Sequence, residues 1–374
     1  MIAGVCFTPQ IIHATPLSQE MKDRIALYPS YYAEDYTNVE KLYRFLLPVS
    51  DQRKLKESDL DHFSPFELTL ARNEIYARKG HVFKDKRFRN YFEEKPWYKP
   101  NPSFTGKLLS TTEQYNIDFI QRIETAEAAR IQRFDSSDNF RILQVGEKIQ
   151  GQADLDGDGT KETITLRQVK TYTGEGTGEI EIQVGKVQLR VKGISANTHS
   201  LSAIRLFDNA PEKVLAVYHF EEPARNGTTY LFRYDGKTIR PLKGRISGDT
   251  DNLRFDGRGN IRTTVYAENI CFYPTQERYK VEGMTITPLK QEYATVNAFV
   301  SSLRSIPLVT APNSTKASTS IPKDEMVLIR RNKGNWFELI SESGKTGWLE
   351  VKGYTKKGAE ALDNSYFQLL PYSD

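Results

Sequence analysis

Residues 64–80 carry a full set of helix signals and constrain the fold more than any other segment. Ser64, Pro65 and Glu67 form a capping-box pattern with proline at the first helical position. Apolar residues follow at positions i, i+3 and i+7, and they give the helix one apolar stripe. Gly80 supplies the left-handed residue that commonly ends a helix. The sequence therefore predicts a helix over 65–79 with one buried face.

A second helix is predicted to begin at another capping box. Ser110 and Glu113 occupy its two key positions, and isoleucines at helical spacing continue a buried face to residue 126. The segment 88–98 between the two helices is rich in aromatic residues, which we expect to pack between them. Residues 55–131 are therefore predicted to form a small helical domain.

A distinctive motif ends the first helix and continues through this domain. It consists of the run 70–80 (LARNEIYARKG), Phe83, Phe92, Trp97-Tyr98 and Asn116-Ile117. Over about residues 55–125 it resembles the YARHG domain, a bacterial extracellular module. Lys79 departs from the family, which has histidine there, and His81 follows two places later. The resemblance implies an exported protein but assigns no molecular function.

Charged residues of the helical domain are candidates for ligand binding. Arg72 and Arg78 lie about two turns apart and can clamp an anionic group, although an ion-pair network within the domain is the alternative. Between Arg72 and Lys107 there are ten Lys or Arg and four Asp or Glu, a net +6 that exceeds the +4 of the whole chain. This excess favours an acidic cell-surface polymer, or simply a solvated basic face. We do not expect nucleic acid as the partner.

The segment 154–162 has the spacing of a cation-binding loop. Asp154, Asp156 and Asp158 stand at positions 1, 3 and 5, with a glycine at position 6. Thr160 offers its carbonyl at position 7, and Glu162 follows at position 9, directly or through water. Hard oxygen ligands of this kind predict Ca²⁺. A tight Asp-Gly turn without metal is the alternative, since the glutamate usual at position 12 of an EF-hand is missing.

Residues 140–300, which include this loop, are predicted to form an antiparallel β domain. Residues 179–184 alternate with period two, Asp235-Gly236 signals a hairpin and 256–260 signals a turn. The loop resembles the Asp-rich loops of extracellular β repeats. We therefore expect the strands to form a sandwich-like or propeller-like domain, of a kind found in secreted proteins.

A separate small β unit is predicted at residues 304–354, followed by a tail at 355–374. Its Gly-Asn-Trp and Thr-Gly-Trp-Leu elements resemble a bacterial SH3-like domain, which implies a small closed barrel. The resemblance also implies peptide or cell-wall binding, for which Trp336 and Trp348 are the candidate groove residues. The alternative is that both tryptophans fill the barrel core.

The N-terminal residues 1–14 resemble the tail of a secretory signal peptide, and 15–54 are predicted to be a linker. Because no run of about 18 apolar residues occurs, no transmembrane helix is predicted. Two cysteines, Cys6 and Cys271, do not make a disulfide framework or a cysteine-rich zinc site.

These features together predict an α+β multi-domain protein with an N-terminal helical domain, a central antiparallel β domain and a C-terminal SH3-like β-barrel. We expect an exported envelope protein, periplasmic, surface-bound or secreted, that binds cell-wall polymer or peptide without catalysis. The alternative is a cell-wall or carbohydrate hydrolase that uses carboxylates of the β domain. Cys271 is the one cysteine for a Cys-His enzyme, and its apolar neighbours indicate a structural thiol instead.

Overall fold

The computed structural model describes residues 45–47, 49–60, 63–95, 97–134, 143–170, 178–194, 199–219, 227–267, 273–341, 343–351 and 366–368. A few helices form the N-terminal part, and antiparallel sheets form the rest, which confirms the coarse α+β prediction. The predicted signal peptide 1–14, Cys6 and Cys271 lie outside the described residues. Within them, no helix is both long and apolar enough to cross a membrane.

The helical part forms around the two predicted helices, and both capping boxes are present. Ser64 accepts a hydrogen bond from the backbone N–H of Glu67, whose carboxylate accepts one from the N–H of Ser64. Gly80 follows the first helix with φ of 85°, as its role of stop residue requires. The helices are α3 (Glu57–Leu60), α4 (Pro65–Ala77), α5 (Lys86–Glu93), η1 (Gly106–Leu108) and α6 (Thr111–Ala128).

This domain begins earlier than residue 55. Leu47 is buried and joins the apolar core between α4 and α6, together with Leu55 and Ile117. Residues 45–54, predicted as the end of a linker, are therefore integral to the helical domain where the structure describes them. No sequence pattern indicated this role, because side chains far along the chain, those of Glu74 and Asn116, form the hydrogen bonds to the backbone of this segment.

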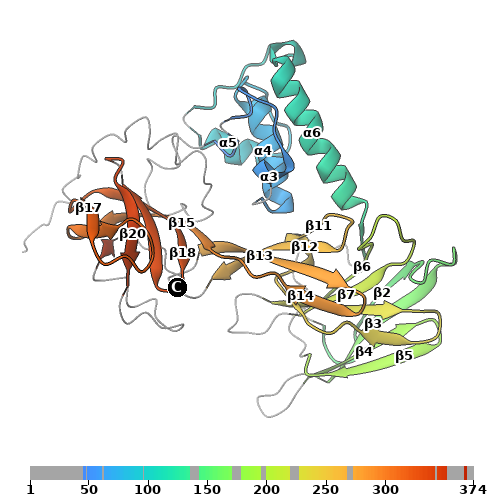
Figure 1. Cartoon of the computed structure of the whole chain (residues 1–374). Coiled ribbons are helices and arrows are strands. Elements are labelled where there is room, and N and C mark those ends of the chain that lie inside the picture. Colours follow the sequence, from blue (N-terminus) through green and yellow to red (C-terminus); the bar gives the residue numbers. More distant parts are fainter. Residues whose placement is uncertain are drawn as a thin grey trace, which may run out of the picture.

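Three consecutive antiparallel meanders form the central β region (Figure 1). The first is β2 (Lys148–Ala153), β3 (Glu162–Lys170), β4 (Glu179–Val184) and β5 (Val187–Lys192). The second is β6 (His199–Ile204), β7 (Val214–His219), β8 (Thr228–Tyr234), β9 (Ile239–Pro241) and β10 (Ile246–Ser247), with β1 (Ile131–Arg133) added beside β6. The third is β11 (Leu253–Phe255), β12 (Asn260–Ala267), β13 (Tyr273–Glu282) and β14 (Thr285–Pro288).

The second sheet is packed on both faces. Leu215 and Val217 point into a core shared with the first sheet, whereas Val214 and Ala216 point into a core shared with the third. Every residue of β7 is accordingly buried, as expected of a strand covered on both sides. The central region is thus a stack of sheets with two separate apolar layers.

A seven-stranded antiparallel half-barrel forms the C-terminal part, in the order β17-β16-β20-β19-β18-β15-β21. It extends beyond the predicted unit 304–354 at both ends. β15 (Ala294–Ser302) pairs with β18, and Phe367 of β21 (Phe367–Gln368) is buried in its core. The other strands are β16 (Ile306–Val309), β17 (Ala317–Ile321), β18 (Met326–Lys333), β19 (Trp336–Ser341) and β20 (Thr346–Glu350).

Candidate functional site

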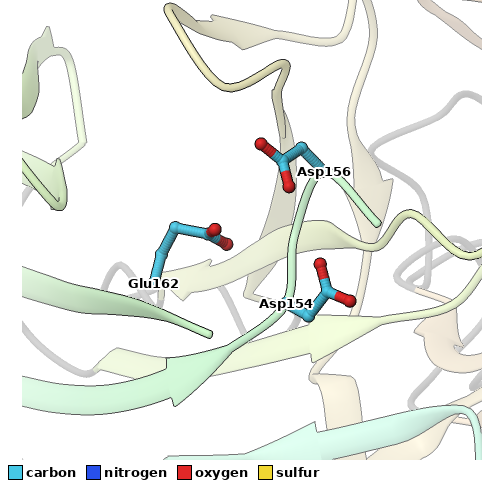
Figure 2. Close-up of side chains that lie close together, drawn as sticks. All are labelled: Asp154, Asp156 and Glu162. Atoms are coloured by element: carbon cyan, nitrogen blue, oxygen red, sulfur yellow. The ribbon is translucent and has the colours of Figure 1, made fainter. Parts of the chain in front are cut away.

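The Asp-rich loop connects β2 to β3 and gathers three carboxylates. Asp154, Asp156 and Glu162 each place an oxygen within 4.8 Å of the others (Figure 2). All three side chains are partly buried. The predicted positions 1, 3 and 9 therefore meet in space, and their hard oxygens have the chemistry of a site for a cation such as Ca²⁺.

Backbone N–H groups hold two of these carboxylates in place. Asp154 accepts hydrogen bonds from Gly157 (2.8 Å) and Gly159 (3.1 Å), and Glu162 accepts one from Leu155 (2.8 Å). Gly157 has φ of 80°, and a Cβ there would lie 2.7 Å from Pro211. Glycine is therefore required both by the turn and by the packing of the loop on the segment before β7.

Asp158, the remaining predicted carboxylate, is not part of this cluster. Asp158 is exposed, and its carboxylate accepts a hydrogen bond from the N–H of Thr160 at 2.6 Å. This short-range bond is typical of an Asx turn. The structure thus brings together three of the five predicted residues and gives Asp158 a turn-forming contact.

Negative charge accumulates in the loop. Burial, together with the nearby charges of Asp156 and Asp154, raises the pKa of Glu162 above its usual value, against a hydrogen bond from Leu155. Burial and the nearby charges of Glu162, Asp156, Asp235 and Asp158 raise the pKa of Tyr234 on the adjoining sheet. A bound cation would relieve this repulsion.

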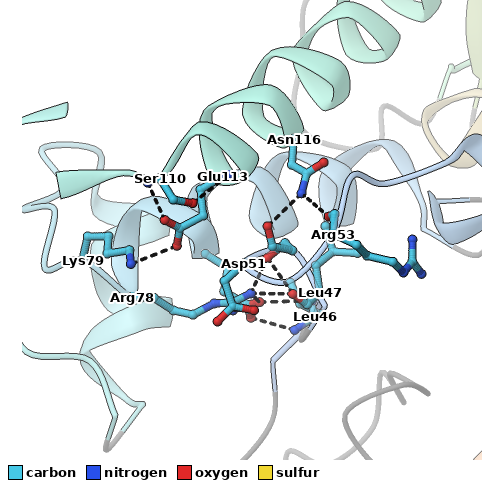
Figure 3. Close-up of polar contacts among 11 residues, drawn as sticks. Leu46, Leu47, Asp51, Arg53, Arg78, Lys79, Ser110, Glu113 and Asn116 are labelled. Carbon is cyan, nitrogen blue, oxygen red and sulfur yellow. Dashed lines mark hydrogen bonds and ion pairs between the residues drawn. The ribbon is translucent and has the colours of Figure 1, made fainter. Parts of the chain in front are cut away.

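In the helical domain, a buried carboxylate ties residues 46–47 to α4 (Figure 3). Glu74 is 1% exposed and accepts hydrogen bonds from the N–H groups of Leu46 (2.7 Å) and Leu47 (3.1 Å). Burial raises the pKa of Glu74, opposed by the charge of Arg78 and by these N–H groups. Arg78 also donates to the carbonyl of Leu47 and to Ser50, so the predicted ligand residue is engaged inside the domain.

Asn116 on α6 fastens the next stretch of chain. It is fully buried, donates to the carbonyls of Ser50 (2.7 Å) and Arg53 (2.8 Å), and accepts from the N–H of Leu55 (2.8 Å). One amide side chain thereby satisfies three backbone groups of a loop without secondary structure. These three hydrogen bonds give a structural reason for asparagine at this position of the motif.

Lys79, which replaces the histidine of the motif, bonds to the second helix. Its ammonium lies 3.1 Å from Glu113, the capping-box carboxylate of α6. Burial acts to raise the pKa of Glu113, but hydrogen bonds from Ser110 and Lys79 outweigh it and hold the pKa below its usual value. His81 packs against aromatic rings instead, including Phe83 at 4.8 Å, and burial lowers its pKa.

Several of these basic residues have partners within the helical domain. Arg72 bonds to Glu124 on α6 at 2.6 Å, and Arg87 pairs with Asp85 at 2.8 Å. Lys95 lies over the ring of Tyr91 at 4.3 Å. These contacts account for Arg72 and Arg78 as structural residues, and their role as ligand-binding residues stays a prediction.

Trp336 and Trp348 lie on the face of the half-barrel opposite its apolar core, yet they are 9% and 6% exposed. The ring of Trp348 lies 5.7 Å from that of Tyr293, and the guanidinium of Arg331 approaches both rings. Arg331 is held by Glu338 at 2.6 Å. Arg331 therefore already lies against Tyr293 and Trp348 on this face.

A cavity of about 420 Å³ lies between the second and third central sheets. It is lined by residues around β10, along β13 and after β14, among them Arg245, Glu277 and Tyr279. Sequence reasoning missed this feature, because its residues come from three separate segments, 245–247, 277–279 and 288–291, which share no motif.

The comparisons with known proteins agree with the geometry of the helical part. The family profile described as the YARHG domain matches residues 43–125. Residues 43–125 form a YARHG domain. The match starts before the predicted residue 55, consistent with the buried position of Leu47. YARHG domains are generally found in extracellular or periplasmic proteins. No curated protein and no solved structure matches the chain significantly.

Proposed function

We propose that this chain is an exported protein of the bacterial envelope that binds a cell-wall polymer or peptide without catalysis. The YARHG domain at 43–125 carries the proposal, because this module is generally found outside the cytoplasm. The domain is also joined firmly to the β stack, which would present any ligand site in a fixed orientation. Its surface lysines Lys84 and Lys86 are exposed and suit an acidic envelope surface.

The Asp-rich loop is proposed to hold Ca²⁺ between Asp154, Asp156 and Glu162. Their convergence within 4.8 Å and the raised pKa of Glu162 support this role. The ion would stiffen the link between β2 and β3 and offset the repulsion among the carboxylates.

The C-terminal half-barrel is proposed to be SH3-like, as its hairpins and tryptophans suggest. Its aromatic outer face is occupied by Arg331, so we assign ligand binding to the central cavity instead. This cavity has one carboxylate, Glu277, among its lining residues. A glycosidase normally uses a pair, and the single carboxylate favours binding over the hydrolase alternative.

The test is a sedimentation assay of the full chain with purified peptidoglycan. It is run once with about 1 mM Ca²⁺, an extracellular concentration, and once with a chelator. The proposal expects the protein in the pellet, with no release of soluble sugar or peptide fragments. Fragment release would favour the hydrolase. Protein that stays in the supernatant with every envelope fraction would contradict envelope binding.

A further inference from the structure

We propose that the cavity between β10 and the β13–β14 hairpin binds a neutral sugar ring of a glycan chain. The inference deepens the function proposed above and rests on it. It names the ligand class at a site for which the sequence offers no motif.

The size and location of the cavity suit a small ligand. Its volume of about 420 Å³ falls in the lower part of the range common for ligand sites. It opens where the second and third sheets of the stack meet over their shared apolar core, so strands of both sheets supply its walls. A rigid border of this kind limits the rearrangement needed on binding.

The floor of the cavity is a fixed polar network centred on Tyr279. The Tyr279 hydroxyl accepts a hydrogen bond from the N–H of Ser247 at 3.1 Å and is bonded to the Glu277 carboxylate. The Tyr279 ring is buried, and burial raises the pKa of its hydroxyl to about 12. The hydroxyl therefore stays protonated at neutral pH, and Glu277 keeps lone pairs available for a ligand.

Charges of both signs line the cavity, from Arg245, Arg278 and Glu277, and Arg278 already interacts with another group. Arg245 is exposed, and among the described residues it has no ion pair or hydrogen bond. Glu277 supplies the opposite charge on another wall. A sugar hydroxyl is both donor and acceptor, so a ring can accept from Arg245 and donate to Glu277. A cationic ligand would be repelled by Arg245 and Arg278, and an anionic group on the wall of Glu277 would be repelled by that carboxylate.

An apolar wall completes the site. Pro288 and Leu289 line the cavity, and Leu289 is 42% exposed although it is a large apolar residue. The C–H face of a sugar ring can cover such a wall while its hydroxyls contact the polar floor. Mixed apolar and polar linings of this kind are typical of small-ligand sites.

The experiment titrates the full chain, by calorimetry, with neutral tetrasaccharides of glucose and of N-acetylglucosamine and with a free stem peptide from the same wall. We expect at least one tetrasaccharide to bind, with little dependence on salt, and the peptide not to bind. Arg245→Ala should weaken sugar binding by about tenfold or more, as loss of a good hydrogen-bonding partner does. Lys290→Ala is the control, because this exposed lysine lies beside the cavity but does not line it.

The inference is overturned if neither sugar binds, if only the peptide binds, or if Lys290→Ala weakens binding as much as Arg245→Ala. An unchanged melting temperature of Arg245→Ala establishes that the variant is folded. The peptidoglycan sedimentation assay separates the two proposals. If wild-type protein sediments but binds neither sugar, the envelope function stands and the sugar site fails. If wild-type protein does not sediment, the envelope function fails.

Discussion

Glu127 near the end of α6 and Arg254 on β11 form a two-pronged ion pair between the YARHG domain and the β stack. The Arg254 Nε lies 2.9 Å from one carboxylate oxygen, and an Nη lies 2.8 Å from the other. The second Nη of Arg254 donates to the carbonyls of Leu60 (2.6 Å) and Phe63 (3.1 Å). Arg254 is 4% exposed, so one buried guanidinium joins three residues of the helical domain to the third sheet.

Replacing Arg254 should uncouple the two parts. We expect Arg254→Met to lower the free energy of unfolding by about 3–5 kcal/mol, because it leaves Glu127 and two carbonyls unpaired in a buried interface. Urea denaturation should then show separate transitions for helical and β signals. Arg240→Met, which removes an exposed pair with Asp235, is the matched control and should leave one transition. A single unshifted transition in Arg254→Met would contradict the role assigned to this residue.

Asn116→Ala should destabilise the YARHG domain by more than about 2 kcal/mol. The substitution removes the partner of three backbone groups, each of which costs about 1–3 kcal/mol if it stays buried and unsatisfied. Thermal unfolding followed by circular dichroism measures the loss. Asn90→Ala on the exposed side of α5 is the control and should shift the midpoint little. Equal effects of the two variants would show that the Asn116 contacts are unimportant.

The Lys79–Glu113 pair should make stability depend on acid pH. The pKa of Glu113 is lower in the folded state than in the unfolded state, where it is near 4.5. The stabilisation that ionised Glu113 provides is therefore complete above pH 4.5, and it is lost as the pH falls through the pKa of the folded state. Lys79→Met should cost about 1 kcal/mol at neutral pH and progressively less below pH 4.5. In a Glu113→Gln background the same substitution should cost almost nothing. A pH-independent cost would argue against the pair.

Calcium affinity should distinguish two aspartates of one loop. Asp156 belongs to the carboxylate cluster and accepts a long hydrogen bond of 3.3 Å from the N–H of Asp158, whereas Asp158 is exposed and outside the cluster. Asp156→Asn should therefore weaken Ca²⁺ binding by more than about tenfold. Asp158→Asn should weaken it much less. Calorimetric titration provides the measurement, and absence of heat in the wild type would remove the metal proposal.

Phe367→Ala should destabilise the C-terminal half-barrel by about 3–5 kcal/mol, since its ring is 1% exposed among the residues of that core. Phe66→Ala, where the ring is 44% exposed, provides the comparison and should cost less than about 1 kcal/mol. Denaturant unfolding of both variants tests the assignment. A negligible effect of Phe367→Ala would mean that the segment 366–368 is a dispensable tail.

The sequence alone determined features whose causes are local. The capping boxes at Ser64 and Ser110, the stop at Gly80 and the turn at 154–162 all depend on neighbours within a few residues. Such contacts are encoded by spacing, and the YARHG match at 43–125 recognises the same local pattern. The Asp loop was predicted for the same reason, but the structure brings together Asp154, Asp156 and Glu162 and leaves the predicted ligand Asp158 outside the cluster.

Only the tertiary structure decided features that depend on distant partners. Leu47 belongs to the helical core because Glu74 and Asn116 satisfy the backbone around it, and no local pattern announces those bonds. Phe367 and β15 join the half-barrel through strand pairing across long separations. The cavity at Tyr279 exists because two stacked sheets meet there. The spacing of residue types along the chain specifies the helices and turns, but the packing of distant segments decides which surfaces remain open to a ligand.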